Sequence, residues 1–192
     1  MTNTCRLEPA SPVMTDRRLT LLLSSRETLP MNLSWQVEDG YLVMSTWGED
    51  GDSIILGLWG PGDVVIPSLI DFEPLQLCSL SSVHVQEWNP SEQERLQFLR
   101  DQVRQLASLQ RLTRILPAAT RLFRLLLWLD ERCGRVNSRG VSLSFEAMNL
   151  THRQLAHISG LTRVTVTKSL TQFRQEGRLS RQGRDELLLP HS

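Results

Sequence analysis

The sequence of 192 residues predicts an α+β fold in which an antiparallel β domain is followed by a helical region. The first observation is that residues 16–90 consist of short apolar runs rich in β-branched and aromatic residues. The second is an abrupt change at Pro90-Ser91, after which no glycine occurs until Gly134. The third is that the apolar residues after this point recur every three or four positions, which indicates helices.

The β domain is predicted from its turn signals. Asp39-Gly40, Asp50-Gly51 and the Gly60–Asp63 segment separate the runs "YLVMSTW", "SIILGLW", "VVIPSLI" and "SSVHVQEW". We therefore expect residues 1–15 to be a tail and residues 16–90 to form hairpins of one β domain. The five tryptophans are expected in the core, although some of them could line a small-molecule cavity; they are Trp35, Trp47, Trp59, Trp88 and Trp128.

Residues 91–116 are expected to form one long helix. Ser91 is a suitable N-cap, and Glu94, three residues later, completes a capping box. Four apolar residues at alternating spacings of three and four form the seam of a helix that pairs with a second copy: Leu96, Leu99, Val103 and Leu106. The alternative is that this helix lies on its own β domain. Pro117 is expected to end it.

Residues 117–192 are expected to form a separate domain. Its first helix, "PAATRLFRLLLWLDERCG", has a core stripe of Leu122, Leu125, Leu126 and Leu129 and should stop near Gly134. A short strand is expected at Val141–Leu143. Thr151 can then cap a helix from His152 to about Ile158.

Ala156 and Gly160 indicate a sharp turn between this helix and the next. Ala156 is small enough for close helix crossing, and Gly160 permits a positive φ. Thr162 can cap the following helix, "RVTVTKSLTQF", whose residues Val166, Leu170 and Phe173 share an inward face. Its opposite face is basic and threonine-rich, and consists of Arg163, Val164, Thr167, Lys168 and Thr171.

This pattern is typical of a helix-turn-helix that reads DNA in the major groove with its second helix. Arg163 can donate two hydrogen bonds to guanine, Val164 can pack on a thymine methyl, and Lys168 can reach a base or a phosphate. A hairpin around Gln182-Gly183 would form a wing that contacts phosphates. The predicted DNA-binding residues are Thr151, His152, Arg153, Thr162, Arg163, Val164, Thr165, Thr167, Lys168, Thr171, Arg181 and Arg184.

The charge is divided unevenly along the chain. Residues 1–90 contain four arginines and twelve acids, a balance of −8, whereas the remaining seventeen cations and nine acids give +8. This asymmetry either indicates a C-terminal half that meets a polyanion or reflects an unevenly charged surface.

No apolar run is long enough for a membrane span, and no signal peptide is seen. Three distant cysteines predict reduced thiols in a cytosolic protein.

The order of β domain, long helix and winged helix-turn-helix resembles the family of the cyclic-AMP receptor protein and the fumarate-nitrate reduction regulator. The resemblance implies a shortened, cupin-like β roll and a dimerisation helix. The segment "LTRVTVTKSL" is most similar to the recognition helix of the cyanobacterial global nitrogen regulator, and Thr162, Arg163, Thr165 and Lys168 keep the family pattern. Val164 replaces the usual glutamate, so the resemblance implies a GTA-like half-site.

The family's effectors find little support in this sequence. Ile66-Pro67 stands where a cyclic-nucleotide sensor has glycine-glutamate, and no arginine occurs between Arg26 and Arg95 to pair with a phosphate. An iron–sulfur cluster needs about four clustered cysteines, and this sequence has only three, far apart. His84 and Cys78 could be a pair of metal ligands, but a histidine on a strand is more often structural. We therefore expect no cofactor and no metal, and the effector, if any, stays unknown.

These observations predict a cytosolic homodimeric transcription regulator that binds a near-palindromic DNA site and is not controlled by a cyclic nucleotide. RNA polymerase is a possible further partner, and no contact with a membrane is expected. The alternative is a ligand-sensing or protein-docking module with weak or lost DNA specificity. The sequence shows no paired carboxylates, activated nucleophile or metal cluster, so no enzymatic activity is predicted.

Overall fold

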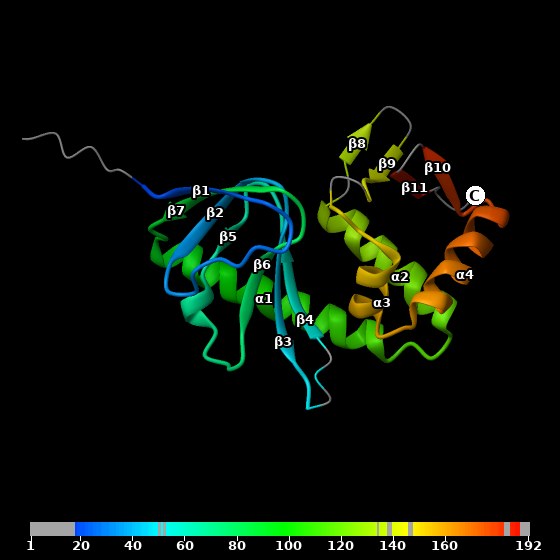
Figure 1. Ribbon diagram of the computed structural model, residues 1–192, viewed down its shortest axis with the longest axis horizontal. Coiled ribbons are helices and arrows are strands. Elements are labelled where there is room, and N and C mark those ends of the chain that lie inside the picture. Colours follow the sequence, from blue (N-terminus) through cyan, green and yellow to red (C-terminus); the bar gives the residue numbers. More distant parts are fainter. Residues whose placement is uncertain are drawn as a thin grey trace, which may run out of the picture.

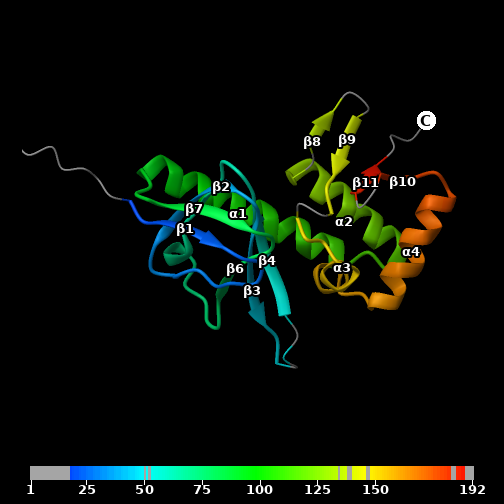
Figure 2. The same ribbon diagram turned by 45° about the horizontal axis from the view of Figure 1, so that its top comes forward.

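The computed structural model describes residues 18–49, 51, 53–133, 135–137, 140–145, 148–182 and 185–188. Figure 1 shows strands β1–β7 on one side of the molecule and helices α2–α4 with strands β8–β11 on the other. The long helix α1 extends from the first part to the second, as the turned view in Figure 2 also shows. The fold is α+β, as the sequence predicts. No helix in the described part of the chain is long and apolar enough to cross a membrane.

The N-terminal part contains two antiparallel sheets. The first has the order β1-β7-β2-β5, and the second has the order β4-β3-β6. Their bounds are β1 Thr20–Leu23, β2 Ser34–Asp39, β3 Leu42–Trp47, β4 Ser53–Trp59, β5 Val64–Val65, β6 Gln76–Ser79 and β7 Val83–Trp88. A short 3₁₀ helix, Pro67–Leu69, follows β5. Both sheets contribute to one apolar core, to which α1 adds Phe98.

The tryptophans do not all lie in the core. Trp35 and Trp59 are buried, and the Trp59 ring stacks on Phe98 with 6.0 Å between ring centroids. Trp88 and Trp128 are half-buried, and Trp47, at the end of β3, is exposed. The expectation of five core tryptophans is therefore wrong for Trp47, because the strand ends there and the side chain is left 41% exposed.

Helix α1 (Glu92–Thr113) begins at the predicted capping box. The Glu94 N–H donates to Ser91 Oγ, the Ser91 N–H donates to Glu94 Oε2, and Trp88 Nε1 donates to Glu94 Oε1 at 3.0 Å. The helix ends at Thr113, and the following residues close its last turn with short-range bonds before Pro117. The predicted domain bounds at residues 15, 90 and 116 stay predictions.

Two different faces of α1 are apolar. Phe98 and Leu109 are buried, together with Gln102, Gln105 and Leu112. The predicted seam is separate from this face and is exposed, with side chains 51%, 38%, 65% and 40% accessible at Leu96, Leu99, Val103 and Leu106. The helix therefore lies on its own β domain and also presents an uncovered apolar stripe.

The C-terminal part is built around α2 (Ala118–Cys133), α3 (His152–Ser159) and α4 (Arg163–Gln175). The predicted stripe of α2, Leu122, Leu125, Leu126 and Leu129, is fully buried. A sheet of order β10-β11-β9-β8 completes this part, with bounds β8 Arg135–Asn137, β9 Gly140–Leu143, β10 Leu179–Gln182 and β11 Asp185–Leu188. β10 and β11 pair antiparallel as the predicted wing.

Candidate nucleic-acid interface

The turn between α3 and α4 has the geometry of a helix-turn-helix. The Thr151 side chain accepts from the Gln154 N–H in a capping box that fixes the start of α3. Gly160 has φ 62° and ψ 36°, a left-handed conformation that favours glycine. The Leu161 N–H donates to the Ala156 carbonyl at 2.9 Å, which closes the turn. Thr162 then caps α4 by accepting from the Thr165 N–H at 3.1 Å.

The inner face of α4 anchors this helix in the C-terminal core. Val166, Leu170 and Phe173 have no exposed surface. The Phe173 ring meets the Phe123 ring of α2 edge to face, with 5.3 Å between centroids. The Arg178 guanidinium lies 3.6 Å from the Phe123 centroid, a cation–π contact that no local sequence pattern predicts. The burial of one face leaves the other face of α4 in a fixed orientation toward solvent.

The outer face of α4 exposes the residues that the sequence placed there: Arg163, Val164, Thr167, Lys168 and Thr171. Val164 is 63% exposed although it is apolar. Burial of its side chain against a partner would be worth up to about 2 kcal/mol. Together these side chains offer a guanidinium group, an ammonium group, hydroxyls and an apolar side chain, which are the groups that contact base edges and thymine methyls.

The threonine hydroxyls of this face are ordered by the helix backbone. Thr167 Oγ1 donates to the Arg163 carbonyl at 2.9 Å, and Thr171 Oγ1 donates to the Thr167 carbonyl at 3.0 Å. His152 Nδ1 lies 2.9 Å from Thr167 Oγ1. His152 therefore joins α3 to the outer face of α4.

The other predicted site residues are distributed around this face. Thr151 and Arg153 are exposed on α3, whereas His152 and Thr165 are half-buried. Thr162 is exposed, and its hydroxyl lies 2.9 Å from Thr165 Oγ1. Arg181 belongs to β10, but its side chain lies outside the described residues, and so does Arg184. The structure thus brings the α3 and α4 residues together and leaves the wing arginines unplaced.

The charge of this region is strongly positive. From Thr151 to Gln182 the chain contains five arginines and Lys168 but a single acid, Glu176. Glu176 lies beyond the end of α4, where Arg178 Nη1 approaches its carboxylate at 3.4 Å. The exposed part of α4 therefore faces solvent without a neighbouring carboxylate along its own helix. Such a surface attracts the phosphates of nucleic acid.

A cavity of about 770 Å³ lies beside this interface. Apolar residues of β4, α1 and α3 line it, among them Ile54, Leu106 and Ile158, and Arg153 of α3 and Arg163 of α4 line it as well. No Asp or Glu belongs to its described lining. The sequence did not predict this cavity, because it is formed by segments from three distant parts of the chain.

Metal ligands are not clustered in the described residues, where no group of three or more His, Cys, Asp and Glu side chains could hold an ion. His84 Nδ1 contacts Glu38 Oε2 at 2.8 Å between neighbouring strands. Cys133 is buried, and this burial raises the pKa of its thiol to about 12. Cys78 and Cys133 are both free thiols.

Comparisons with known proteins agree with this geometry. Residues 120–191 match the family model of the Crp-like helix-turn-helix domain. The regulatory protein CysR of Synechococcus elongatus is 38% identical over 180 residues, which are 93% of this chain and 87% of CysR.

Solved structures support the fold. FixK2 of Bradyrhizobium japonicum has a TM-score of 0.71 and 21% identity, over 90% of this chain and 93% of FixK2. A transcriptional regulator of the CRP family from Thermus thermophilus has a TM-score of 0.69 and 19% identity, over 88% of this chain and 92% of its own. The chain therefore belongs to the family of the cyclic-AMP receptor protein and the fumarate-nitrate reduction regulator, transcription regulators with a helix-turn-helix DNA-binding domain.

Proposed function

We propose that the protein is a sequence-specific transcription regulator that binds, as a homodimer, a near-palindromic DNA site with GTA-like half-sites. The observation that carries this proposal is the outer face of α4, where Arg163, Val164 and Lys168 are exposed on a helix whose other face is buried. Arg163 would read the guanine, and Val164 would contact a thymine methyl. RNA polymerase would be the partner on which the bound regulator acts.

The dimer is supported by the exposed stripe of α1. Four large apolar side chains line one side of a helix that is otherwise polar or packed on the β domain and the C-terminal core. A symmetric pair of α1 helices would bury this stripe and place two copies of α4 on the same side of the DNA, about one helical turn apart. This arrangement explains why a near-palindrome would be the preferred site.

A selection of bound sequences from random DNA, with the full chain, tests the proposal. We expect enrichment of an inverted repeat with GTA-like halves at one spacing. The absence of any enriched motif, with binding that vanishes at moderate salt, would instead indicate nonspecific contact with phosphates.

Control by a cyclic nucleotide is not part of the proposal. The β domain's interior is filled by Trp35, Trp59 and Phe98, and Gly57 has no room for a side chain because a Cβ there would lie 2.5 Å from the Trp59 ring. Ile66 and Pro67 are buried as well. In the described residues no arginine lies between Arg26 and Arg95, so a buried phosphate would lack its charge partner.

Calorimetry with cyclic AMP up to millimolar concentration is therefore expected to show no saturable heat. The DNA affinity should also be the same with and without the nucleotide. A saturable isotherm, or a DNA affinity that changes with cyclic AMP, would contradict this prediction.

A ligand-sensing module is the second candidate function, and the cavity beside α3 and α4 is the observation that favours it. In this case DNA binding would be weak and independent of sequence. The selection experiment separates the two candidates, because only the first predicts an enriched motif.

A further inference from the structure

Helix α2 carries two arginines on one face. Arg121 lies in its first turn and Arg132 in its last, and both side chains are half-buried. Their separation of 11 residues corresponds to about 16 Å along the helix and an angular offset of about 20°. Both therefore project to the same side of α2, close to its opposite ends.

Arg121 connects the end of α1 to the turn between α3 and α4. Its Nε donates to the Ile115 carbonyl at 2.8 Å, just beyond α1. Its Nη1 donates to the carbonyls of Ser159 at 3.2 Å and Gly160 at 3.4 Å. These carbonyls stand at the C-terminus of α3, where the helix dipole favours a cation. One guanidinium thus links the long helix to the turn from which α4 begins.

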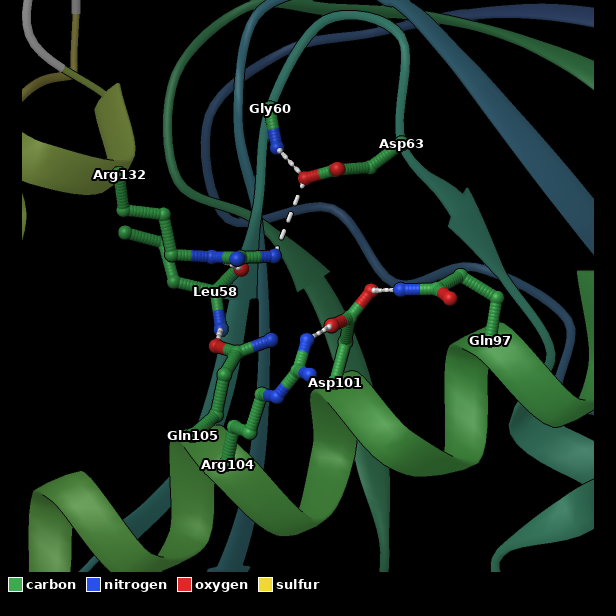
Figure 3. A network of polar contacts seen from close by, with 8 residues as sticks. All are labelled: Leu58, Gly60, Asp63, Gln97, Asp101, Arg104, Gln105 and Arg132. Atoms are coloured by element: carbon green, nitrogen blue, oxygen red, sulfur yellow. Dashed lines mark hydrogen bonds and ion pairs between the residues drawn. The ribbon is translucent and has the colours of Figure 1, made fainter.

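Arg132 connects the other end of α2 to the β domain, as Figure 3 shows. Its Nε donates to the Leu58 carbonyl at 2.6 Å, and its Nη2 lies 3.2 Å from Asp63 Oδ2. The same oxygen of Asp63 accepts from the Gly60 N–H at 2.9 Å. Burial raises the pKa of Asp63, while Gly60 and Arg132 lower it, so Arg132 provides the counter-charge of a partly buried carboxyl.

The strand that Arg132 contacts is also held by α1. The Leu58 N–H donates to Gln105 Oε1 at 2.7 Å, and Gln102 Nε2 donates to the Leu56 carbonyl at 2.9 Å. Strand β4 is at the edge of its sheet, so these backbone groups lack strand partners on that side. Helices α1 and α2 therefore meet at Leu58 and bind opposite polar groups of one residue.

We infer that Arg121 and Arg132 are positioning residues that fix the direction in which the DNA-binding domain presents α4 relative to α1. The apolar contacts of Leu122, Leu125 and Leu126 hold α2 in place but are not directional. The two guanidinium groups add hydrogen bonds of defined direction at two separated points, which prevents rotation of the domain.

This inference rests on the proposed dimer, in which the two copies of α1 lie together. The positions of the two α4 helices then depend on how α2 is attached to α1 and β4. Each added base pair between half-sites shifts the second half by about 35° of rotation. The two arginines would therefore determine which half-site spacing the dimer accepts.

The test is a binding series with duplexes whose two half-sites are separated by spacers that differ by one base pair. For the wild-type chain we expect about a tenfold preference for one spacer. In the double variant Arg121→Gln/Arg132→Gln this preference should fall to about twofold. Arg124→Gln is the matched control, because Arg124 is exposed on the same helix and should leave the spacing profile unchanged.

Binding to a single half-site, compared with a scrambled one, reports whether α4 still folds and reads bases. It should be the same in the double variant and the wild type.

If the double variant unfolds, the variants Arg121→Lys and Arg132→Lys decide the question, since lysine keeps the charge but lacks the several directed N–H donors of a guanidinium group. These two variants should partly flatten the spacing profile. A spacing profile unchanged in the folded variants would overturn the inference, whereas a wild-type chain without any spacing preference would refute the proposed dimeric site instead.

Discussion

Replacement of both Val103 and Leu106 by glutamate should convert the protein from dimers to monomers in analytical ultracentrifugation. The two side chains are 65% and 40% exposed in the single chain, and neither belongs to one of its buried core clusters. In a symmetric pair each position occurs twice, and burial of the exposed fractions of these four side chains contributes roughly 3–6 kcal/mol to association. Glutamates in the same place would add like charges across the seam.

The chain offers a control with the same change of charge. Gln93 and Gln97 are exposed on α1 but lie outside the seam, and Gln97 Nε2 donates to Asp101 Oδ2 on the same helix at 2.8 Å. The variant Gln93→Glu/Gln97→Glu should therefore remain dimeric. Circular dichroism should show that all variants keep their helices. Unchanged dimers in the Val103→Glu/Leu106→Glu variant would rule out this interface.

The helix-turn-helix could be predicted closely from the sequence because its signals are local. Thr151 and Thr162 cap helices by bonds to residues three positions on, and Gly160 is needed for a positive φ within one turn. The inward face of α4 follows from the spacing of Val166 and Phe173 alone. None of these signals depends on where the rest of the chain lies.

The contacts between the two parts of the molecule could not be predicted in this way. Gln102 and Gln105 interrupt the apolar pattern of α1, yet both are buried because their amides bond to the edge strand β4. From the sequence alone, Arg121 and Arg132 are indistinguishable from the other arginines of the C-terminal half, which would be expected on the surface. Their role depends on carbonyl groups that lie 38 and 74 residues away along the chain, and no local pattern encodes that distance.

The β domain lies between these cases. The turn signal at Asp50-Gly51 correctly predicts the hairpin of β3 and β4. The hairpins expected at Asp39-Gly40 and Gly60–Asp63 are wrong, because these turns join strands of different sheets, and the order β1-β7-β2-β5 pairs strands from opposite ends of the domain. Trp47 shows the same difficulty, because a large aromatic residue predicts burial while its position at a strand end exposes it. Long-range pairing and strand ends are therefore what the sequence leaves undetermined here.

Substitution of Arg163 by alanine should remove most of the discrimination between the selected DNA site and a scrambled one. Arg163 occupies the first turn of α4 and is exposed there. A cation at this end of a helix is disfavoured by the helix dipole, by about 0.3–1 kcal/mol, so the residue does not serve the stability of the fold. The alanine variant should melt at the same temperature as the wild type or slightly higher. Its effect on DNA can then be separated from folding.

The expected size of the effect follows from the contact. A bidentate bond between arginine and guanine is worth about 1–3 kcal/mol of discrimination, and a near-palindromic site contains it twice. The specific affinity should therefore fall by about 2–6 kcal/mol, whereas binding to scrambled DNA should change little. Lys168, one turn further along the exposed face, is expected to contact a base as well, so Lys168→Ala should lose part of the discrimination.

Arg181 provides the contrast, because a residue of the wing strand β10 is expected to touch only phosphate. Arg181→Ala should weaken binding to both DNAs equally and reduce the slope of log affinity against log salt by about one unit. Salt titrations of the wild type and the three variants, on both duplexes, give all of these quantities. If Arg163→Ala lowers the two affinities by the same factor, α4 does not read sequence. The protein would then be better explained as a ligand-sensing module, because the exposed face of α4 would contribute charge and not base recognition.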